Sequence, residues 1–302
     1  MTMSQFNISD RQSAHERVRE IVSASGTSFF WAMRLLPLER RQAIFAVYAF
    51  CRLVDDVADE EGLDADKRAE LDQWRNAISG LFQTPQIFTP ADENMAATLF
   101  ILSDAIKDYG LIEADFQAVI DGMEMDAHGP VALETMDVLD LYCDRVASAV
   151  GRLCVPIFGQ PDEKGRLVAD HLGRALQLTN IIRDVPEDAE IKRLYLPQDL
   201  LAKYEMDNKS PDDVAGHPNL PKAITELGRL AQDRYDSASA AIADCDATAM
   251  RAPIVMMKVY YQNLKRLRSV DWQPQTLRTQ GKLTKAMRKA EKLIIGLRYG
   301  LF

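Results

Sequence analysis

The sequence lacks several features that identify common classes of protein. Its four cysteines include no Cys-x-x-Cys pair, and its four histidines lack the spacing of zinc ligands. Its longest apolar run, residues 43–51, is far shorter than the roughly 20 residues that span a bilayer. These absences argue against a zinc site and a membrane-spanning protein, and we expect the cysteines to be reduced residues of the core.

Positive charge is also scarce. The chain has 36 Lys and Arg residues against 45 Asp and Glu residues, a net charge of −9, which argues against nucleic acid as a partner. An anionic substrate would therefore need basic residues gathered where it binds. Residues 1–19 are polar and have no apolar core of the signal-peptide type, so we expect a cytoplasmic protein.

The alternation of apolar and polar residues that is typical of β-strands is nearly absent, whereas apolar residues recur with helical spacing throughout the chain. With 302 residues, 47% apolar composition and no break in composition, the sequence predicts one all-α domain over residues 1–302. An exposed loop is expected at 205–221 and a turn-rich segment at 271–281. The helices are expected at about 13–24, 65–82, 93–109, 113–126, 138–158, 163–188, 222–244 and 253–268, with a long one after Pro37 and a basic one over 282–299.

The long helix after Pro37 is predicted to end in three carboxylates. Cys51, Asp55 and Asp59 are spaced by four, so on a helix they share the apolar face. Like charges one turn apart destabilise a helix by roughly 0.2–0.5 kcal/mol, and by more where water is excluded. We therefore expect a cation beside them. Asp56 points to another side of the helix and either supports this group or pairs with an arginine.

A second polar row is predicted on the helix at 163–188, whose other faces are apolar; it consists of Gln177, Asn180, Asp184 and Asp188. Pro186 cannot donate a helical hydrogen bond, which costs about 3 kcal/mol inside a helix unless the helix kinks or ends. Asp184 is therefore the firmer assignment, because the direction of Asp188 depends on the course of the chain at Pro186.

The two rows together favour a functional site over the structural alternatives. A single aspartate row is typical of a solvated face, or of a buried acid that an arginine neutralises. Here both rows lie on apolar helices, and each has an adjacent arginine, Arg52 or Arg183. Oxygen ligands without histidine or thiol companions favour Mg²⁺, or Mn²⁺ in its place, shared with substrate phosphates. Such a site suits loss of a diphosphate group inside apolar walls that shelter a carbocation.

These segments carry a family resemblance. The two acidic motifs at 55–59 and 180–188, together with the segments 48–52, 142–151 and 193–197, resemble the motifs of the squalene and phytoene synthase family. The resemblance spans about residues 21–268 and implies an isoprenoid synthase fold, a helical bundle around a central cavity. Members of the family join two prenyl diphosphates head to head. Segments 120–126 and 141–151 are most similar to the bacterial members that form presqualene diphosphate for hopanoid synthesis.

The resemblance also implies roles for individual residues. The metal ligands would be Asp55, Asp59, Asn180, Asp184 and Asp188, and of these the four aspartates, with Tyr142, would be catalytic. Substrate would be bound by Ser28, Tyr48, Arg52, Gln177, Arg183, Arg193, Tyr195 and Tyr260. Structural alternatives remain open for several: a helix cap for Ser28, ion pairs for the arginines, and core packing for the tyrosines. Asp126 is expected to be structural or exposed.

The implied substrate is farnesyl diphosphate, with Mg²⁺ as the cofactor and no NADPH. The absence of a nicotinamide fingerprint is consistent with a reaction that stops before reduction, although family members that reduce their product also lack it. Phytoene synthesis from geranylgeranyl diphosphate, squalene synthesis and a catalytically silent prenyl-lipid binding protein are the alternatives. The acceptor of the proton lost in the reaction is either the released diphosphate or a tyrosine. The sequence leaves the oligomeric state open, and downstream squalene-forming enzymes would be partners.

The basic helix expected at 282–299 has two interpretations. It either lies on an anionic membrane, which would place the protein at the inner face of the membrane, or packs on the core with its basic side outward.

Overall fold

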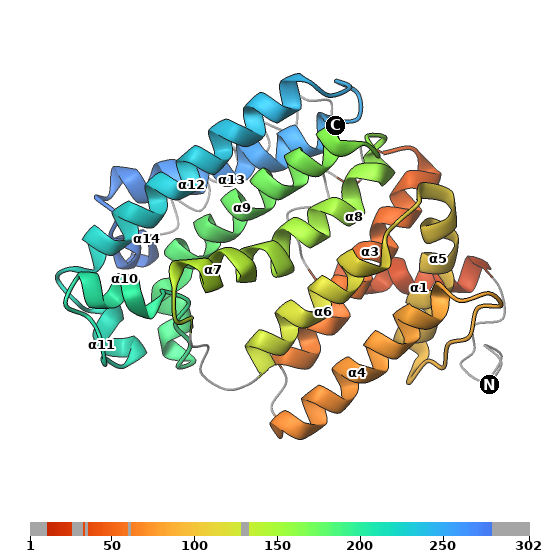
Figure 1. Ribbon diagram of the computed structural model, residues 1–302, viewed down its shortest axis with the longest axis horizontal. Helices are drawn as coiled ribbons and strands as arrows, with labels where there is room; N and C mark the ends of the chain where they lie inside the picture. The colour runs from red at the N-terminus through yellow and green to blue at the C-terminus, as the bar shows by residue number, and fades with distance from the viewer. Residues whose placement is uncertain (1–10, 26–32, 34–35, 60–61, 128–132, 280–302) are drawn as a thin grey trace.

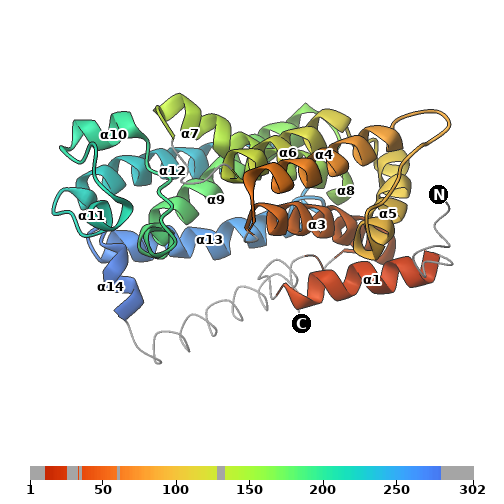
Figure 2. The same cartoon turned by 90° about the horizontal axis from the view of Figure 1, so that it is seen from below.

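The protein is built from two layers of packed helices (Figure 1). The computed structural model describes residues 11–25, 33, 36–59, 62–127 and 133–279. Within these residues every regular element is a helix, which confirms the all-α prediction. One layer contains helices whose axes lie roughly parallel in Figure 1: α12 (Leu220–Ala243), α9 (Glu163–Glu190), α8 (Ala149–Phe158), α6 (Glu113–Ala127) and α4 (Asp64–Leu81). Figure 2 shows a second layer with α13 (Arg251–Ser269), α3 (Leu38–Asp59) and α1 (Arg11–Ala24).

The remaining elements cover the ends of these layers. They are α5 (Glu93–Tyr109), α7 (Met136–Cys143), the π-turn η2 (Asp144–Ser148), α10 (Gln198–Lys203), α11 (Pro211–Ala215) and α14 (Pro274–Thr279). Two large buried clusters form the core: one joins α1, α3, α4, α5, α6 and α8, and the other joins α7, α9, α10, α12 and α13. Helix α3 belongs to the first cluster, whereas α9 contributes Ala169 to the first cluster and most of its buried hydrophobic residues to the second.

Local sequence signals account for the end of α8 and the start of α9. The Asp162 side chain accepts a hydrogen bond from the Gly165 amide and caps its first turn. Gly159, just before this cap, ends α8 with φ at +109°, a backbone conformation that costs glycine little. The short link of Gly159 to Asp162 turns the chain back, so that α8 and α9 pack side by side.

The structure corrects three details. The helix expected at 138–158 contains a π-turn at 144–148, the expected loop at 205–221 contains α11, and the turn-rich segment at 271–281 contains α14. Helix α9 continues through Pro186 to Glu190. Pro186 is buried and lies in the last turns of α9, so packing offsets the single hydrogen bond that it cannot make.

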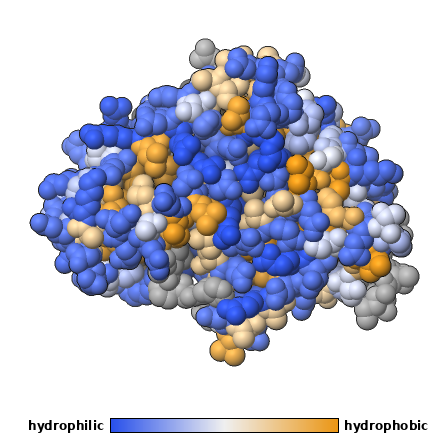
Figure 3. Space-filling view, viewed as in Figure 1, coloured by the Kyte–Doolittle hydropathy of each residue, from blue (hydrophilic) through white to orange (hydrophobic). Residues whose placement is uncertain are grey.

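Several expectations drawn from the composition can be compared with the described residues. The face in Figure 3 is mostly hydrophilic, with separate apolar patches. Among the described residues, no helix has the length and apolar character that a membrane span requires. All four cysteines are free, as expected, and Cys143 is buried. Ser28 and the expected helix at 282–299 lie outside the described residues.

Candidate active site

A cavity of about 310 Å³ lies between α3, α6, η2, α8, α9 and α13. Most of its lining is apolar, with side chains such as Val47, Val119 and Leu172. Its charged and amide lining consists of Asp55 and Asn180 from the two acidic motifs, with Arg52 and Gln177 one turn before them. The predicted ligands Asp59, Asp184 and Asp188 are not among the residues that line it. A larger hollow of about 760 Å³ between α1 and α3 contains none of the predicted site residues. The apolar cavity with polar groups from two helices is therefore the better candidate for the active site.

The acids at the end of α3, which we name the α3 row, are Asp55 and Asp59. Arg52 lies one turn earlier, pairs closely with Asp56 and reaches Asp55 Oδ2 at 3.4 Å. Asp56 is thus an arginine partner, one of the two roles that the sequence allowed. Burial raises the pKa of Asp55 to about 6, and the negative charge of Asp59 adds to this effect. The α3 row therefore holds more negative charge than its own arginine neutralises.

The facing polar residues of α9, which we name the α9 row, are Gln177, Asn180, Asp184 and Asp188. Asp184 accepts hydrogen bonds from both Nε, at 2.6 Å, and Nη2 of its neighbour Arg183. Burial raises the pKa of Asp188 to about 7, and the charge of Asp184 acts in the same direction. The positive charge of Arg193 opposes this rise of the pKa.

One orphaned atom in the α9 row tests whether the site fits a cation. Asn180 Oδ1 is buried and has no hydrogen-bond partner among the described residues. A buried carbonyl oxygen without a partner costs free energy, and a metal ion or its bound water would satisfy it. Together with the carboxylates of the α3 row, Asn180 Oδ1 gives a donor set of oxygens only, as Mg²⁺ prefers. The residues present therefore fit the predicted metal.

The carboxylates do not form a closed metal site by themselves. Among the described residues, no three His, Cys, Asp or Glu side chains lie close enough together to hold an ion. Mg²⁺ usually keeps part of its coordination for water and substrate phosphates. The two rows are therefore suited to an ion that arrives with a diphosphate.

Arg193 connects the two rows. It follows α9, and its Nη1 donates to Asp59 Oδ1 on α3 at 2.7 Å. Its Nη2 donates to the Ala58 carbonyl at 3.3 Å, and Lys67 binds the same carbonyl at 2.8 Å. These bonds satisfy the C-terminal end of α3, where cations are favourable. Arg193 thus has a structural role at the end of α3 and a position beside the acids of the α3 row.

The predicted tyrosines separate into two groups. Tyr48 and Tyr260 line the cavity. Tyr142 is 3% exposed, donates from its hydroxyl to Asp126 Oδ2 at 3.0 Å, and stacks on Tyr195 with ring centroids 5.3 Å apart. Burial and the charge of Asp126 raise the pKa of Tyr142 well above its usual value, so the hydroxyl keeps its proton.

Asp126 is the residue whose importance the sequence analysis missed. It is only 8% exposed, and burial raises its pKa to about 6 although Tyr142 donates to it. A signal was present, because Ile120, Met123 and Asp126 follow one another at steps of three on α6 and continue a buried face. Its partners lie on other elements, so the sequence did not show that it was hydrogen-bonded.

An all-helical bundle whose apolar cavity is lined by polar side chains of two helices is the architecture of an isoprenoid synthase, and comparison with known proteins agrees. The squalene/phytoene synthase family model matches residues 22–286, so the chain belongs to that family. The presqualene diphosphate synthase of Rhodopseudomonas palustris is 43% identical over 81% of this chain and 84% of its own. The phytoene synthase of Mycobacterium tuberculosis is 32% identical over 85% and 83%.

Solved structures share the fold. A dehydrosqualene synthase crystallised with a ligand is 26% identical and superposes with a TM-score of 0.74 over 88% of this chain and 89% of its own. The squalene synthase HpnC of Alicyclobacillus acidocaldarius, 23% identical, has a TM-score of 0.76 over 90% and 99%. The predicted family and fold class are therefore confirmed.

Proposed function

We propose that the protein is a presqualene diphosphate synthase, which joins two farnesyl diphosphates head to head and releases one diphosphate. The observation that carries the proposal is that one apolar cavity is lined by Asp55 of the α3 row and by Gln177 and Asn180 of the α9 row. Apolar walls suit prenyl chains, and the rows suit diphosphates. The relatives of 40% identity or more that are named presqualene diphosphate synthase support this choice over phytoene synthesis.

Mg²⁺, when bound, would neutralise charge on the departing diphosphate oxygens. Asp55 and Asp59 would hold it from one side, and Asn180, Asp184 and Asp188 from the other. Arg52, Arg183 and Arg193 pair with Asp56, Asp184 and Asp59 respectively, and their guanidinium groups would also donate to diphosphate oxygens. The arginines would thus orient the leaving group, while Gln177 donates or accepts a hydrogen bond beside them.

The cavity walls would then guide the organic step. Loss of diphosphate leaves an allylic cation at C1 of one farnesyl chain, and the C2–C3 double bond of the other attacks it. The rings of Tyr48 and Tyr260 line the space where the cation forms, and ring faces stabilise cations by roughly 0.5–2 kcal/mol. Exclusion of water by the apolar lining prevents its capture as an alcohol.

Loss of a proton closes the cyclopropane ring of the product. The sequence left two acceptors open, the released diphosphate and a tyrosine. Tyr142 already donates its proton to Asp126 and has a raised pKa, so it is poorly suited to become a phenolate base. We therefore assign the proton to the released diphosphate. Tyr142 and Tyr195, which are not among the cavity-lining residues, would instead hold Asp126 and each other in place.

The test uses purified protein, farnesyl diphosphate and Mg²⁺ or Mn²⁺, with diphosphate release and product identity as measurements. Presqualene diphosphate should form without NADPH, and removal of the metal with EDTA should stop the reaction. Turnover of geranylgeranyl diphosphate alone would instead establish phytoene synthesis. Absence of diphosphate release from either substrate would favour a silent prenyl-lipid binding protein.

The product is apolar over most of its length, so a squalene-forming enzyme is the proposed next partner. Peripheral contact of segment 282–299 with the inner face of an anionic membrane remains a proposal from the sequence. Flotation of the full chain with anionic and neutral vesicles tests it, and equal recovery with both would contradict it.

A further inference from the structure

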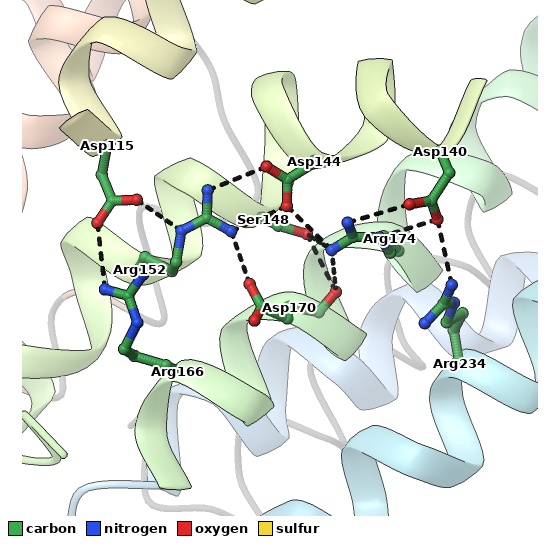
Figure 4. A network of polar contacts seen from close by, with 9 residues as sticks. All are labelled: Asp115, Asp140, Asp144, Ser148, Arg152, Arg166, Asp170, Arg174 and Arg234. Carbon is green, nitrogen blue, oxygen red and sulfur yellow. Dashed lines mark hydrogen bonds and ion pairs between the residues drawn. The ribbon is translucent and has the colours of Figure 1, made fainter. Parts of the chain in front are cut away.

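A network of partly buried ion pairs surrounds the π-turn η2, outside the residues that the proposed function uses (Figure 4). It joins α6, α7, η2, α8, α9 and α12 through Asp115, Asp140, Asp144, Ser148, Arg152, Arg166, Asp170, Arg174 and Arg234. The side chains of Arg152 and Arg174 are 9% and 15% exposed, whereas Asp140, a partner of Arg174, is 44% exposed, so the network is shielded from water on its arginine side. Such shielded, charge-assisted hydrogen bonds are stronger than exposed ones and fix geometry.

Arg174, on α9, spans the whole π-turn. Its Nε and Nη2 donate to the two oxygens of Asp140, in α7, at 2.9 and 3.1 Å. Its Nη1 lies 3.0 Å from Asp144 Oδ1 at the start of η2 and donates to Ser148 Oγ at 3.1 Å at its end. Arg152 donates to both oxygens of Asp144, at 2.9 and 3.1 Å, and shares Oδ1 with Arg174.

The π-turn sets the direction of the side chains that follow it. The Ala149 amide donates to the Asp144 carbonyl five residues earlier, which inserts one residue into the helical turn. One extra residue rotates everything after it by about 100° relative to what precedes it. Tyr142, before the turn, contacts Asp126, whereas Val146 and Ala147, within it, line the cavity.

Two glycines allow neighbouring helices to pack closely against the π-turn η2. A Cβ on Gly173 of α9 would lie 2.6 Å from the Ser148 backbone, and a Cβ on Gly122 of α6 would lie 2.7 Å from Val146 Cγ1. The π-turn is therefore packed directly between two helices. A π-turn is rare and less favourable than a regular helix, so tertiary contacts such as those of Arg174 must hold it.

We propose that Arg174 is a positioning residue for the cavity wall: by binding Asp140, Asp144 and Ser148 together, it holds the π-turn so that Val146 and Ala147 lie against the prenyl chain. This inference rests on the proposed function, because it assigns the wall to a prenyl substrate. It concerns the prenyl chain of the substrate rather than its diphosphate, since Arg174 belongs to neither the α3 row nor the α9 row.

The variant Arg174→Gln tests this role when its affinity for the diphosphate group is measured separately from its affinity for a ligand that also carries the prenyl chain. Binding of inorganic diphosphate with Mg²⁺, and of the unreactive sulfur analogue farnesyl thiodiphosphate with Mg²⁺, is measured by calorimetry. We expect affinity for the farnesyl analogue to fall about five-fold or more, as misplaced wall side chains lose contacts, and affinity for diphosphate to change less than about two-fold. Arg174→Lys, which keeps the charge without the fork of donors, should give an intermediate loss.

Amide hydrogen exchange gives a second measurement that needs no substrate. In Arg174→Gln, the amides of 144–149 should exchange faster than in the wild type, while those of α5 should not change. Arg17→Gln is the matched control, because Arg17 also joins two helices, by donating to Asn94 at 2.7 Å, but lies outside the cavity lining. It should alter neither measurement.

The proposal is overturned if both ligands lose affinity equally, or if neither affinity nor exchange at 144–149 changes. Should Arg174→Gln fail to fold by circular dichroism, Asp144→Asn, which keeps the shape but removes one charge, takes its place with the same expected pattern. Wild-type protein that binds diphosphate but not the farnesyl analogue would refute the proposed function, whereas unchanged exchange would refute the role of Arg174 alone.

Discussion

Arg193 and Asp59 form an ion pair at 2.7 Å across 134 positions of sequence, and this pair joins the ends of the two helices that carry the acidic motifs. Asp59 is about half exposed, so the pair itself contributes only about 0–1 kcal/mol to stability. Its importance lies in the placement of a cation and a carboxylate where diphosphate is proposed to bind.

Replacement of Arg193 should therefore affect substrate more than stability. Arg193→Gln is expected to lower kcat/KM about 10-fold or more, since it removes a charge-assisted contact, with a change of less than about 1 kcal/mol in the free energy of unfolding. Steady-state kinetics and urea unfolding measure the two. Lys203→Gln, which removes an exposed pair with Glu226, is the control and should leave kcat/KM unchanged. A large loss of stability with unchanged kinetics would assign Arg193 a structural role only.

Asp55→Asn should abolish turnover while preserving the fold. Loss of one carboxylate from the proposed metal site is expected to reduce kcat by about 100-fold or more. Because burial and Asp59 raise the pKa of Asp55 to about 6, its negative charge is unfavourable in the folded state at neutral pH. The variant should therefore melt at the same temperature or higher than the wild type. An unchanged rate of diphosphate release would remove Asp55 from the metal site.

Stability without metal should depend on pH through Asp188. Its pKa is raised to about 7 in the folded protein from an unfolded value near 4, so the folded state binds the proton more tightly. The stability that this provides is fully present below about pH 4 and is lost as pH rises through about 7. In denaturant titrations from pH 5 to 8, Asp188→Asn should show a smaller decline than the wild type. Parallel curves for the two proteins would contradict the raised pKa.

Tyr142 and Asp126 should be energetically coupled. Tyr142→Phe leaves the buried carboxylate without its donor, and Asp126→Ala leaves the buried hydroxyl without its acceptor, each at a cost of about 1–3 kcal/mol. The double variant should cost less than the sum of the single ones, because neither polar group is then left unsatisfied. Thermal and urea unfolding of the four proteins measure the coupling. Additive losses would show that the hydrogen bond contributes nothing.

The structure also explains why Asp188 remains in the α9 row. The sequence indicated that Pro186 would cost a hydrogen bond and left the course of the helix there open. Packing of Pro186 and Ala189 in the core offsets that cost, and α9 continues to Glu190. The cost is local, but the compensation comes from contacts with other elements, which the sequence does not display.

The sequence by itself determined the all-helical architecture, most helix positions and both acidic rows, because helical periodicity, caps and i, i+4 spacing depend on residues close together in the chain. Only the tertiary structure decided which side chains meet across the helices. The bonds of Arg193 to Asp59, of Tyr142 to Asp126 and of Arg174 across the π-turn each join distant segments. Their energies depend on packing and burial, which exist only once the two halves of the core have come together.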